Sequence, residues 1–222
     1  MLNAVLLALR DIPTSPFRAV FLKSVGLTLA MLAVVWIGTF AAAEHFAAAL
    51  SDNWRTAVDW LTGLLLFVGL GFLVAPVTAL FAGLYADEVA EVVERTRYPA
   101  DRPGVSQPLM TGLIQALRFT AFVVLVNIAM LPLLFLPGLN IPVFLIVNAY
   151  FLGREYFEQV AMRFRPPEAA RALRSAHSGK VMLGGLSIAL LLAIPILNIL
   201  TPLYATALMV HVVKQAERQE RV

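Results

Sequence analysis

Long uncharged stretches alternate with short charged ones along the chain. Two stretches of more than thirty residues, 119–153 and 181–213, contain no Asp, Glu, Lys or Arg. Each is interrupted near its middle, by Pro-Gly-Leu-Asn at 137–140 and by Pro-Ile-Leu-Asn at 195–198. Such a stretch exceeds one membrane span of about 20 residues but is too short for two spans and a turn. The pattern predicts two helical hairpins that break inside the membrane, at about 111–153 and 181–213.

Two earlier stretches, 24–43 and 61–86, are uncharged without such a break, and we expect long transmembrane helices at about 19–43 and 61–86. The charged segments 87–110 and 154–180 then become amphipathic cytoplasmic connections. The predicted fold is an all-α integral membrane protein in one membrane domain, residues 1–222. It has two long transmembrane helices and two pairs of broken, partly membrane-penetrating helical hairpins.

Composition and charge agree with this topology. The chain is 60% hydrophobic and 14% charged, with a mean hydropathy of +0.81, whereas a soluble domain has about 25% charged residues. Of the 17 Lys and Arg residues, Arg55 alone falls in the loop 44–60 between the two predicted spans. Positive residues accumulate on the cytoplasmic side. Both termini are therefore predicted to be cytoplasmic.

Signatures of enzymes and metal sites do not occur in the sequence. There is no cysteine, and the three histidines lack metal-ligand spacing. Metalloprotease, serine-hydrolase and phosphate-loop motifs are also missing. We expect no enzyme activity, no cofactor or metal, and no nucleic-acid partner.

The most suggestive local site is Ser-Pro-Phe-Arg at 15–18. Ser15 suits a helix N-cap, and the following proline suits the first helical position. The free N–H groups of a first helical turn attract anions, and a guanidinium matches an oxyanion. The sequence predicts an oxyanion-binding turn formed by Ser15, Phe17 and Arg18. The alternative is that Arg18 and Lys23 are positive anchors that touch lipid phosphate.

The two interruptions offer further candidates. Asn140 and Asn198 can cap the helices that follow or donate to an anion, and Pro195 sets the second break. The alternative is that each Asn only satisfies backbone groups freed by the break. The four apolar blocks, 24–43, 61–86, 119–153 and 181–213, contain no Asp, Glu, Lys or Arg. This favours passive conduction over proton-coupled transport, although His211 could still couple.

Other side chains have two possible roles each. The carboxylates that follow residue 86, including Asp87 and Glu88, either hold a cation or form a solvated helix face. Basic residues in 154–180 either attract anions or lie on lipid headgroups. These are Arg171, Arg174 and His177. Interhelical hydrogen bonds are expected from Asn148, Thr206 and His211, and close helix packing from Gly184 and Gly185.

Three motifs together resemble the bacterial CysZ sulfate permeases. They are Ser-Pro-Phe-Arg at 15–18, Gly-Leu-Tyr-Ala-Asp at 83–87, and Ile-Pro-Ile-Leu-Asn at 194–198 with Pro202. The resemblance covers nearly the whole chain in order and spacing. It implies an oligomeric, multi-pass inner-membrane protein that imports sulfate for cysteine synthesis. It also marks Gly83, Leu84, Asp87 and Glu88 as pore candidates.

The chain departs from the family pattern at two motifs. Phe17 stands where the family has glycine, and Ala19 where it has a second arginine. Asp87 replaces a glutamate, with Glu88 beside it. A channel for another oxyanion therefore stays open as an alternative. So does a non-transporting membrane scaffold or assembly protein.

Overall fold

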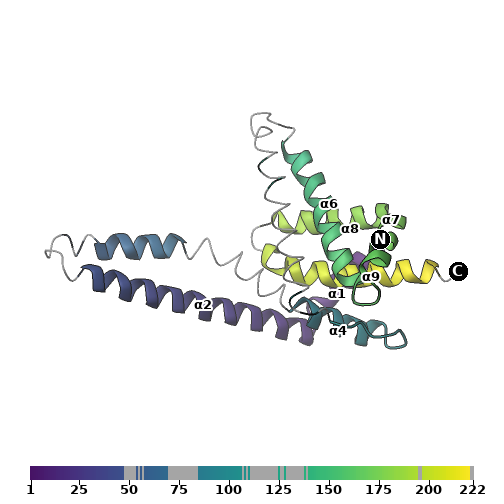
Figure 1. The fold of residues 1–222 in the computed structure, drawn as a ribbon, viewed down its shortest axis with the longest axis horizontal. Coiled ribbons are helices and arrows are strands. Elements are labelled where there is room, and N and C mark those ends of the chain that lie inside the picture. Colours follow the sequence, from purple (N-terminus) through teal and green to yellow (C-terminus); the bar gives the residue numbers. More distant parts are fainter. Residues whose placement is uncertain are drawn as a thin grey trace. The chain divides into compact units, whose positions relative to one another are not determined.

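The computed structural model describes residues 1–47, 54, 56, 58–69, 85–106, 108, 110, 125, 128, 138, 140–194 and 197–220. Within these residues all regular structure is helical, and no strand occurs (Figure 1). The prediction of an all-α fold is therefore confirmed.

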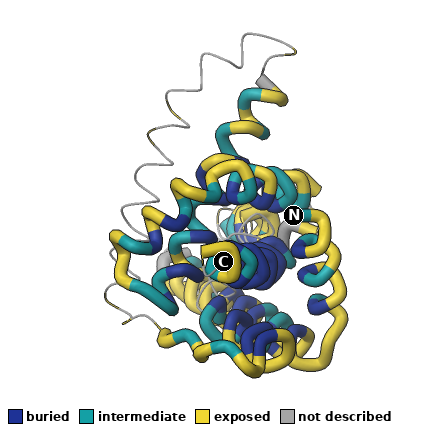
Figure 2. The backbone as a smooth tube through the Cα atoms, turned by 90° about the vertical axis from the view of Figure 1, so that its right-hand side faces the viewer, coloured by how far each residue is buried: buried dark blue, intermediate teal, exposed yellow. Residues whose placement is uncertain are grey.

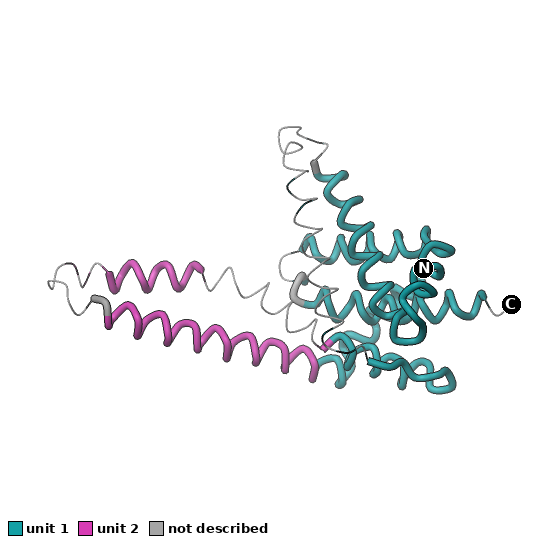
Figure 3. Tube along the Cα trace, viewed as in Figure 1, with its two compact units in different colours: residues 1–18, 86–222 teal, residues 19–85 magenta. Residues whose placement is uncertain are grey.

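The chain divides into two compact units (Figure 3). One unit comprises residues 1–18 and 86–222, and the other comprises residues 19–85. Helix α2, Ser15–Ala47, begins in the first unit and continues through the second.

Helix α2 has the length and composition of a membrane span. Its 33 residues extend about 50 Å at about 1.5 Å per residue, more than the roughly 30 Å of a hydrocarbon core. A narrow stripe that includes Val20, Ser24 and Thr28 is buried. Large apolar side chains such as Leu22 and Ile37 are exposed elsewhere around the helix. Among the described residues, α2 is the one unbroken helix that is long and apolar enough to cross a membrane.

The second predicted long span is described only at its start. Val58–Gly69 is an apolar helix, but it is shorter than a span. Residues 70–84 lie outside the described residues. Two long transmembrane helices therefore remain a prediction. At the first predicted span, helix α2 is long enough to cross a membrane.

Helix α9 forms the centre of the larger unit. Every residue from Thr201 to Lys214 is buried, and Figure 2 shows this buried helix running behind the C-terminus. Four helices pack around it, which are α1 (Leu2–Asp11), α4 (Ala86–Arg97), α6 (Asn140–Ala161) and α8 (Ser178–Leu192). The apolar block predicted from residue 181 to residue 213 thus contributes the core helix of this unit.

The second interruption lies where the sequence places it. Helix α8 ends at Leu192, the short 3-10 helix η2 spans Leu197–Leu200, and α9 spans Thr201–Glu220. At the first interruption, Gly138 has a φ of 91°, and α6 begins at Asn140. Most of the preceding arm lies outside the described residues. The membrane insertion of both hairpins stays a prediction.

Glycines bring α6 and α8 into backbone contact. A β-carbon built on Gly185 would collide with the carbonyl oxygen of Ala149, and one on Gly153 would lie 2.6 Å from that of Val181. On Gly184 it would lie 2.9 Å from the Met209 side chain. Small residues allow this approach because they remove the atoms that would otherwise separate two helices. The predicted close packing at Gly184 and Gly185 is confirmed.

Interhelical hydrogen bonding is confirmed for His211 alone among the three described candidates. His211 contacts Tyr98 and Asp11, whereas Asn148 and Thr206 donate to carbonyl groups of their own helices. The prediction was wrong for Asn148 and Thr206, because donation to the fourth preceding carbonyl satisfies a polar side chain without a partner helix.

Candidate functional site

The predicted oxyanion turn is a tight connection between α1 and α2. The N–H and the hydroxyl of Thr14 both donate to the carbonyl of Asp11, at 3.0 and 2.6 Å. The N–H of Arg18 donates to the carbonyl of Thr14 at 3.0 Å. Thr14 therefore accepts the first hydrogen bond of α2, which is the N-cap position. The assignment of Ser15 as N-cap was wrong by one residue, because the Thr14–Asp11 turn starts the helix earlier.

The side chains of this turn leave a donor group open to solvent. Phe17 is 2% exposed and anchors the turn, whereas Ser15 and Arg18 are exposed. Among the described residues, the Arg18 guanidinium has no ion-pair partner, and the N–H groups of Ser15 and Phe17 meet no acceptor. The Arg18 guanidinium and the Ser15 N–H are open to an anion, and the helix dipole adds positive potential at the same end.

A polar network holds this turn in place, and three of its members, Asp11, Tyr98 and His211, are buried. Arg97 donates to Oδ1 of Asp11 from Nε at 2.9 Å and from Nη2 at 2.6 Å. His211 Nε2 lies 2.9 Å from Asp11 Oδ2, and the Tyr98 hydroxyl lies 2.7 Å from His211 Nδ1. A carboxylate only accepts, so Nε2 carries a proton. The network joins the end of α1 to the end of α4 and to the middle of α9.

The protonation of Asp11 reflects this network. Burial of the carboxyl raises its pKa, but hydrogen bonds from His211 and Arg97 outweigh burial and hold the pKa below its ordinary value. Asp11 is therefore charged at neutral pH and compensates the nearby guanidinium of Arg97.

A second ion-pair cluster shows that the acidic helix α4 does not simply present a solvated face. Arg163 is 3% exposed and pairs with Asp87 and with Glu94, the latter at 3.0 Å. Glu94 is buried and also accepts the N–H of Gly104 at 2.8 Å. Two carboxylates of α4 thus serve to hold the segment after α6. The sequence did not reveal this pairing, because Arg163 lies 69 residues from Glu94.

Several predicted site residues lie wholly or partly outside the described residues. Gly83, Leu84 and Pro195 lie outside the described residues. Asn140 begins α6 and Asn198 lies in η2, but their side chains also lie outside the described residues. Glu88 is half-buried in the first turn of α4. Their roles in a pore remain predictions.

The three basic candidates of α7, Pro167–Ala176, and its end have different surroundings. Arg171 is exposed, Arg174 lies 2.8 Å from a carboxylate oxygen of Glu158, and His177 Nδ1 contacts the carbonyl of Leu173 at 3.2 Å.

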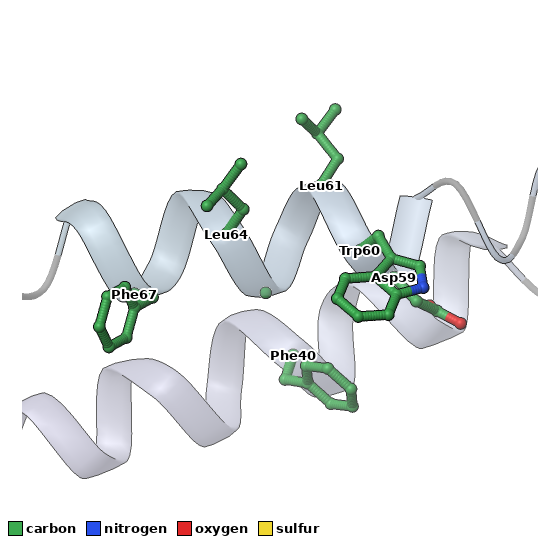
Figure 4. A pocket seen from close by; sticks show the side chains of 7 residues that line it. Phe40, Asp59, Trp60, Leu61, Leu64 and Phe67 are labelled. Carbon is green, nitrogen blue, oxygen red and sulfur yellow. The ribbon is translucent and has the colours of Figure 1, made fainter.

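A large apolar cavity lies in the smaller unit, between α2 and the helix Val58–Gly69 (Figure 4). It measures about 680 Å³ and is lined by Phe40, Trp60 and Phe67, among others. Leu61 and Leu64 point away from α2. Among the described lining residues, Asp59 alone is charged, and its carboxylate disfavours a bound anion. Among the described residues, no group of three or more His, Cys, Asp or Glu is placed to hold a metal.

The described residues define an all-helical protein with one helix that is long and apolar enough to cross a membrane. The family profile described as "Sulfate transporter CysZ/Etoposide-induced protein 2.4" matches residues 4–202. The chain belongs to this family, as its motifs predicted. No curated protein matches the chain. Together with the long apolar helix α2, membership of a transporter family indicates a membrane protein.

Proposed function

We propose that this protein is a sulfate permease or channel of a bacterial inner membrane, which takes up sulfate for assimilation into cysteine. The name of its family supports this proposal. The observation that carries it is the exposed Arg18 at the start of α2, for which the described residues supply no ion-pair partner.

The protein groups proposed to bind sulfate match it in charge and geometry. The Arg18 guanidinium presents parallel N–H groups that match two oxygens of a tetrahedral anion. The N–H groups of Ser15 and Phe17 supply neutral donors at the same helix end. A site of this kind is open to solvent and screened by salt. It suits reversible capture at a pore entrance.

Conduction would then follow the uncharged blocks. We assign Gly83, Leu84, Asp87 and Glu88 to the pore region, and Asn140, Pro195 and Asn198 to the hairpin tips. Lining dipoles and donors are sufficient for passive conduction. Sulfate and the lipid bilayer are the proposed partners, and the protein is proposed to act as a homo-oligomer.

The deciding experiment is sulfate flux. Purified protein in liposomes should pass labelled sulfate, and competing oxyanions should reveal which anion is preferred. Arg18→Ala should reduce flux, while Arg10→Ala, which removes an equally exposed positive charge, should not. A folded protein that passes no oxyanion would overturn the proposal and leave the scaffold alternative.

The proposed topology has its own test. Cysteine introduced at Asp52 should react with an impermeant reagent from outside, and cysteine at Asp101, Glu168 or Gln219 should not. The measurement belongs in the native membrane, where all copies share one orientation. External labelling at position 168 would overturn the same-side hairpins.

A further inference from the structure

A cationic cavity lies in the larger unit, where α7 meets α8. It measures about 290 Å³. Its walls come from α6, α7 and the first turns of α8, and its charged lining residues are Arg154 and Arg174. Neither residue belongs to the turn that begins α2. The cavity is therefore separate from the proposed sulfate entrance.

The packing of α6 on α8 builds this cavity. Gly153 of α6 approaches the backbone of Val181 so closely that a β-carbon would lie 2.6 Å from its carbonyl oxygen. Arg154 follows directly and lines the cavity beside Val181. Helices α7 and α8 meet at an angle of 91°. This bend brings Arg174 to the same cavity from a different direction.

The two guanidinium groups share one carboxylate. A single oxygen of Glu158, Oε1, lies 2.8 Å from Arg174 Nε and 3.3 Å from Arg154 Nε. The Arg174 Nε atom is buried, and its geometry with Glu158 does not form a hydrogen bond. Among the described residues, the terminal Nη groups of both arginines meet no acceptor. Two positive charges thus face one negative charge.

The neighbouring carboxyl of Glu155 does not cancel this excess of positive charge. Burial, reinforced by the charge of Glu158, raises the pKa of Glu155 to about 7 despite the opposing effect of Arg154. Glu155 therefore carries only part of a negative charge at neutral pH. A β-carbon on Gly179 would meet nothing within 4 Å, so the first turn of α8 leaves space here. An anion has both charge complementarity and space at this position.

The remaining walls are apolar, and the cavity lies at a boundary in the sequence. Val181 and Met182 line it together with the half-exposed ring of Tyr150. Arg154 follows the uncharged block 119–153, and Val181 begins the block 181–213. In the predicted topology this boundary is the depth of lipid headgroups, where charged and apolar groups meet.

We propose that this cavity binds a tetrahedral oxyanion of the phosphate or sulfate type, held by Arg154 and Arg174 at the start of α8. The anion is either free in the cytoplasm or the phosphate of an anionic phospholipid, whose acyl chains would contact the apolar wall. Two guanidinium groups converging on one anion provide charge-assisted, bidentate hydrogen bonds. The proposal does not depend on sulfate transport.

Binding to purified protein tests the proposal in two arms. In the first arm, delipidated protein carrying Arg18→Ala is titrated with inorganic sulfate and inorganic phosphate, so that the proposed entrance turn does not contribute. In the second arm, protein without that change is reconstituted with or without phosphatidylglycerol, and the bound lipid is quantified by native mass spectrometry. Each arm compares Arg154→Gln, Arg174→Gln and Arg174→Lys.

The matched control is Arg171→Gln, which removes one positive charge from an exposed position of α7. Arg154→Gln and Arg174→Gln should each weaken binding at least about tenfold, the effect of losing one charge-assisted hydrogen bond. Arg174→Lys should fall between Arg174→Gln and the parent, because it keeps the charge but not the fork. If Arg174→Gln does not fold, Arg174→Lys and Arg154→Gln provide the comparison.

The two arms identify the source of the anion. Loss of inorganic anion binding identifies a soluble ligand, and loss of retained phosphatidylglycerol alone identifies a headgroup. Unchanged binding in both arms, or equal loss in Arg171→Gln, would overturn the proposal. A parent protein without sulfate flux would contradict the proposed transport function and leave these binding results unaffected.

Discussion

The Nε2 atom of His211 lies 2.9 Å from the Oδ2 atom of Asp11 and joins two residues that are 200 positions apart. Asp11 also fixes Thr14 through its carbonyl, and Thr14 accepts the first hydrogen bond of α2. The start of α2, including Arg18, is therefore positioned by the central helix α9. This relationship connects the proposed anion turn to the core of the unit.

Asp11→Asn should destabilise the protein and misplace the turn. The amide cannot accept from both Arg97 and His211 as the carboxylate does, and we expect a loss of about 1–3 kcal/mol. Sulfate affinity should fall together with the melting temperature. Arg95→Gln, which removes an exposed pair with Glu91, should cost less than about 1 kcal/mol. An unchanged melting temperature in Asp11→Asn would contradict the assigned role.

Acid should remove the contribution of Asp11. Its pKa in the folded protein lies below the ordinary 3.8, so its stabilising effect is complete above the unfolded pKa and lost as pH falls through the folded pKa. Melting curves of the parent and of Asp11→Asn should differ by a constant amount above pH of about 5 and converge at lower pH. A difference that grows on acidification would reverse the inferred sign.

Arg163→Met should be among the most destabilising single changes. It leaves the buried Glu94 without its ion-pair partner, and breaking a buried pair costs about 3–5 kcal/mol. Adding Glu94→Gln should restore part of the loss, because the stranded charge is removed. Thermal unfolding of the two single variants and the double variant measures the coupling. Additive effects would show that the pair is not energetically connected.

Gly185→Ala should disrupt the contact between α6 and α8. Its β-carbon would collide with the carbonyl of Ala149, which is backbone and cannot rotate away. We expect a lower melting temperature and a loss of about 1–3 kcal/mol, as for overpacked cores. Gly179→Ala on the same helix meets nothing within 4 Å and should have little effect on stability. Equal melting temperatures for the two variants would argue against the close approach.

Arg18 should contribute more than its charge to sulfate binding. Arg18→Ala removes a charge-assisted hydrogen bond of about 1.5–3 kcal/mol, which corresponds to roughly tenfold to a hundredfold weaker binding. Arg18→Lys should recover only part of this, because lysine has no planar fork. Sulfate titrations at rising chloride should show weaker binding, since the site is exposed. If Arg18→Lys restored the full sulfate affinity, the positive charge of residue 18 alone would account for its contribution.

Local patterns predicted the helical elements well. The uncharged run around α2 and the break between α8 and α9 both depend on residues close together in the chain. Proline and glycine interrupt helices, and long apolar runs extend them, whatever lies nearby. The motifs also led to the family, because they retain their order and spacing.

The sequence by itself determined the helical class, the apolar helix α2, the breaks and the exposed Arg18. Only the tertiary structure decided which charges meet. Distant segments meet in the contacts of Asp11 with His211 and of Arg163 with Glu94. A single sequence does not show which distant residues lie close together. The same holds for Arg154 and Arg174, which face one carboxylate because α7 and α8 meet at a sharp bend. Charge pairing follows from helix packing, and packing depends on the whole chain at once.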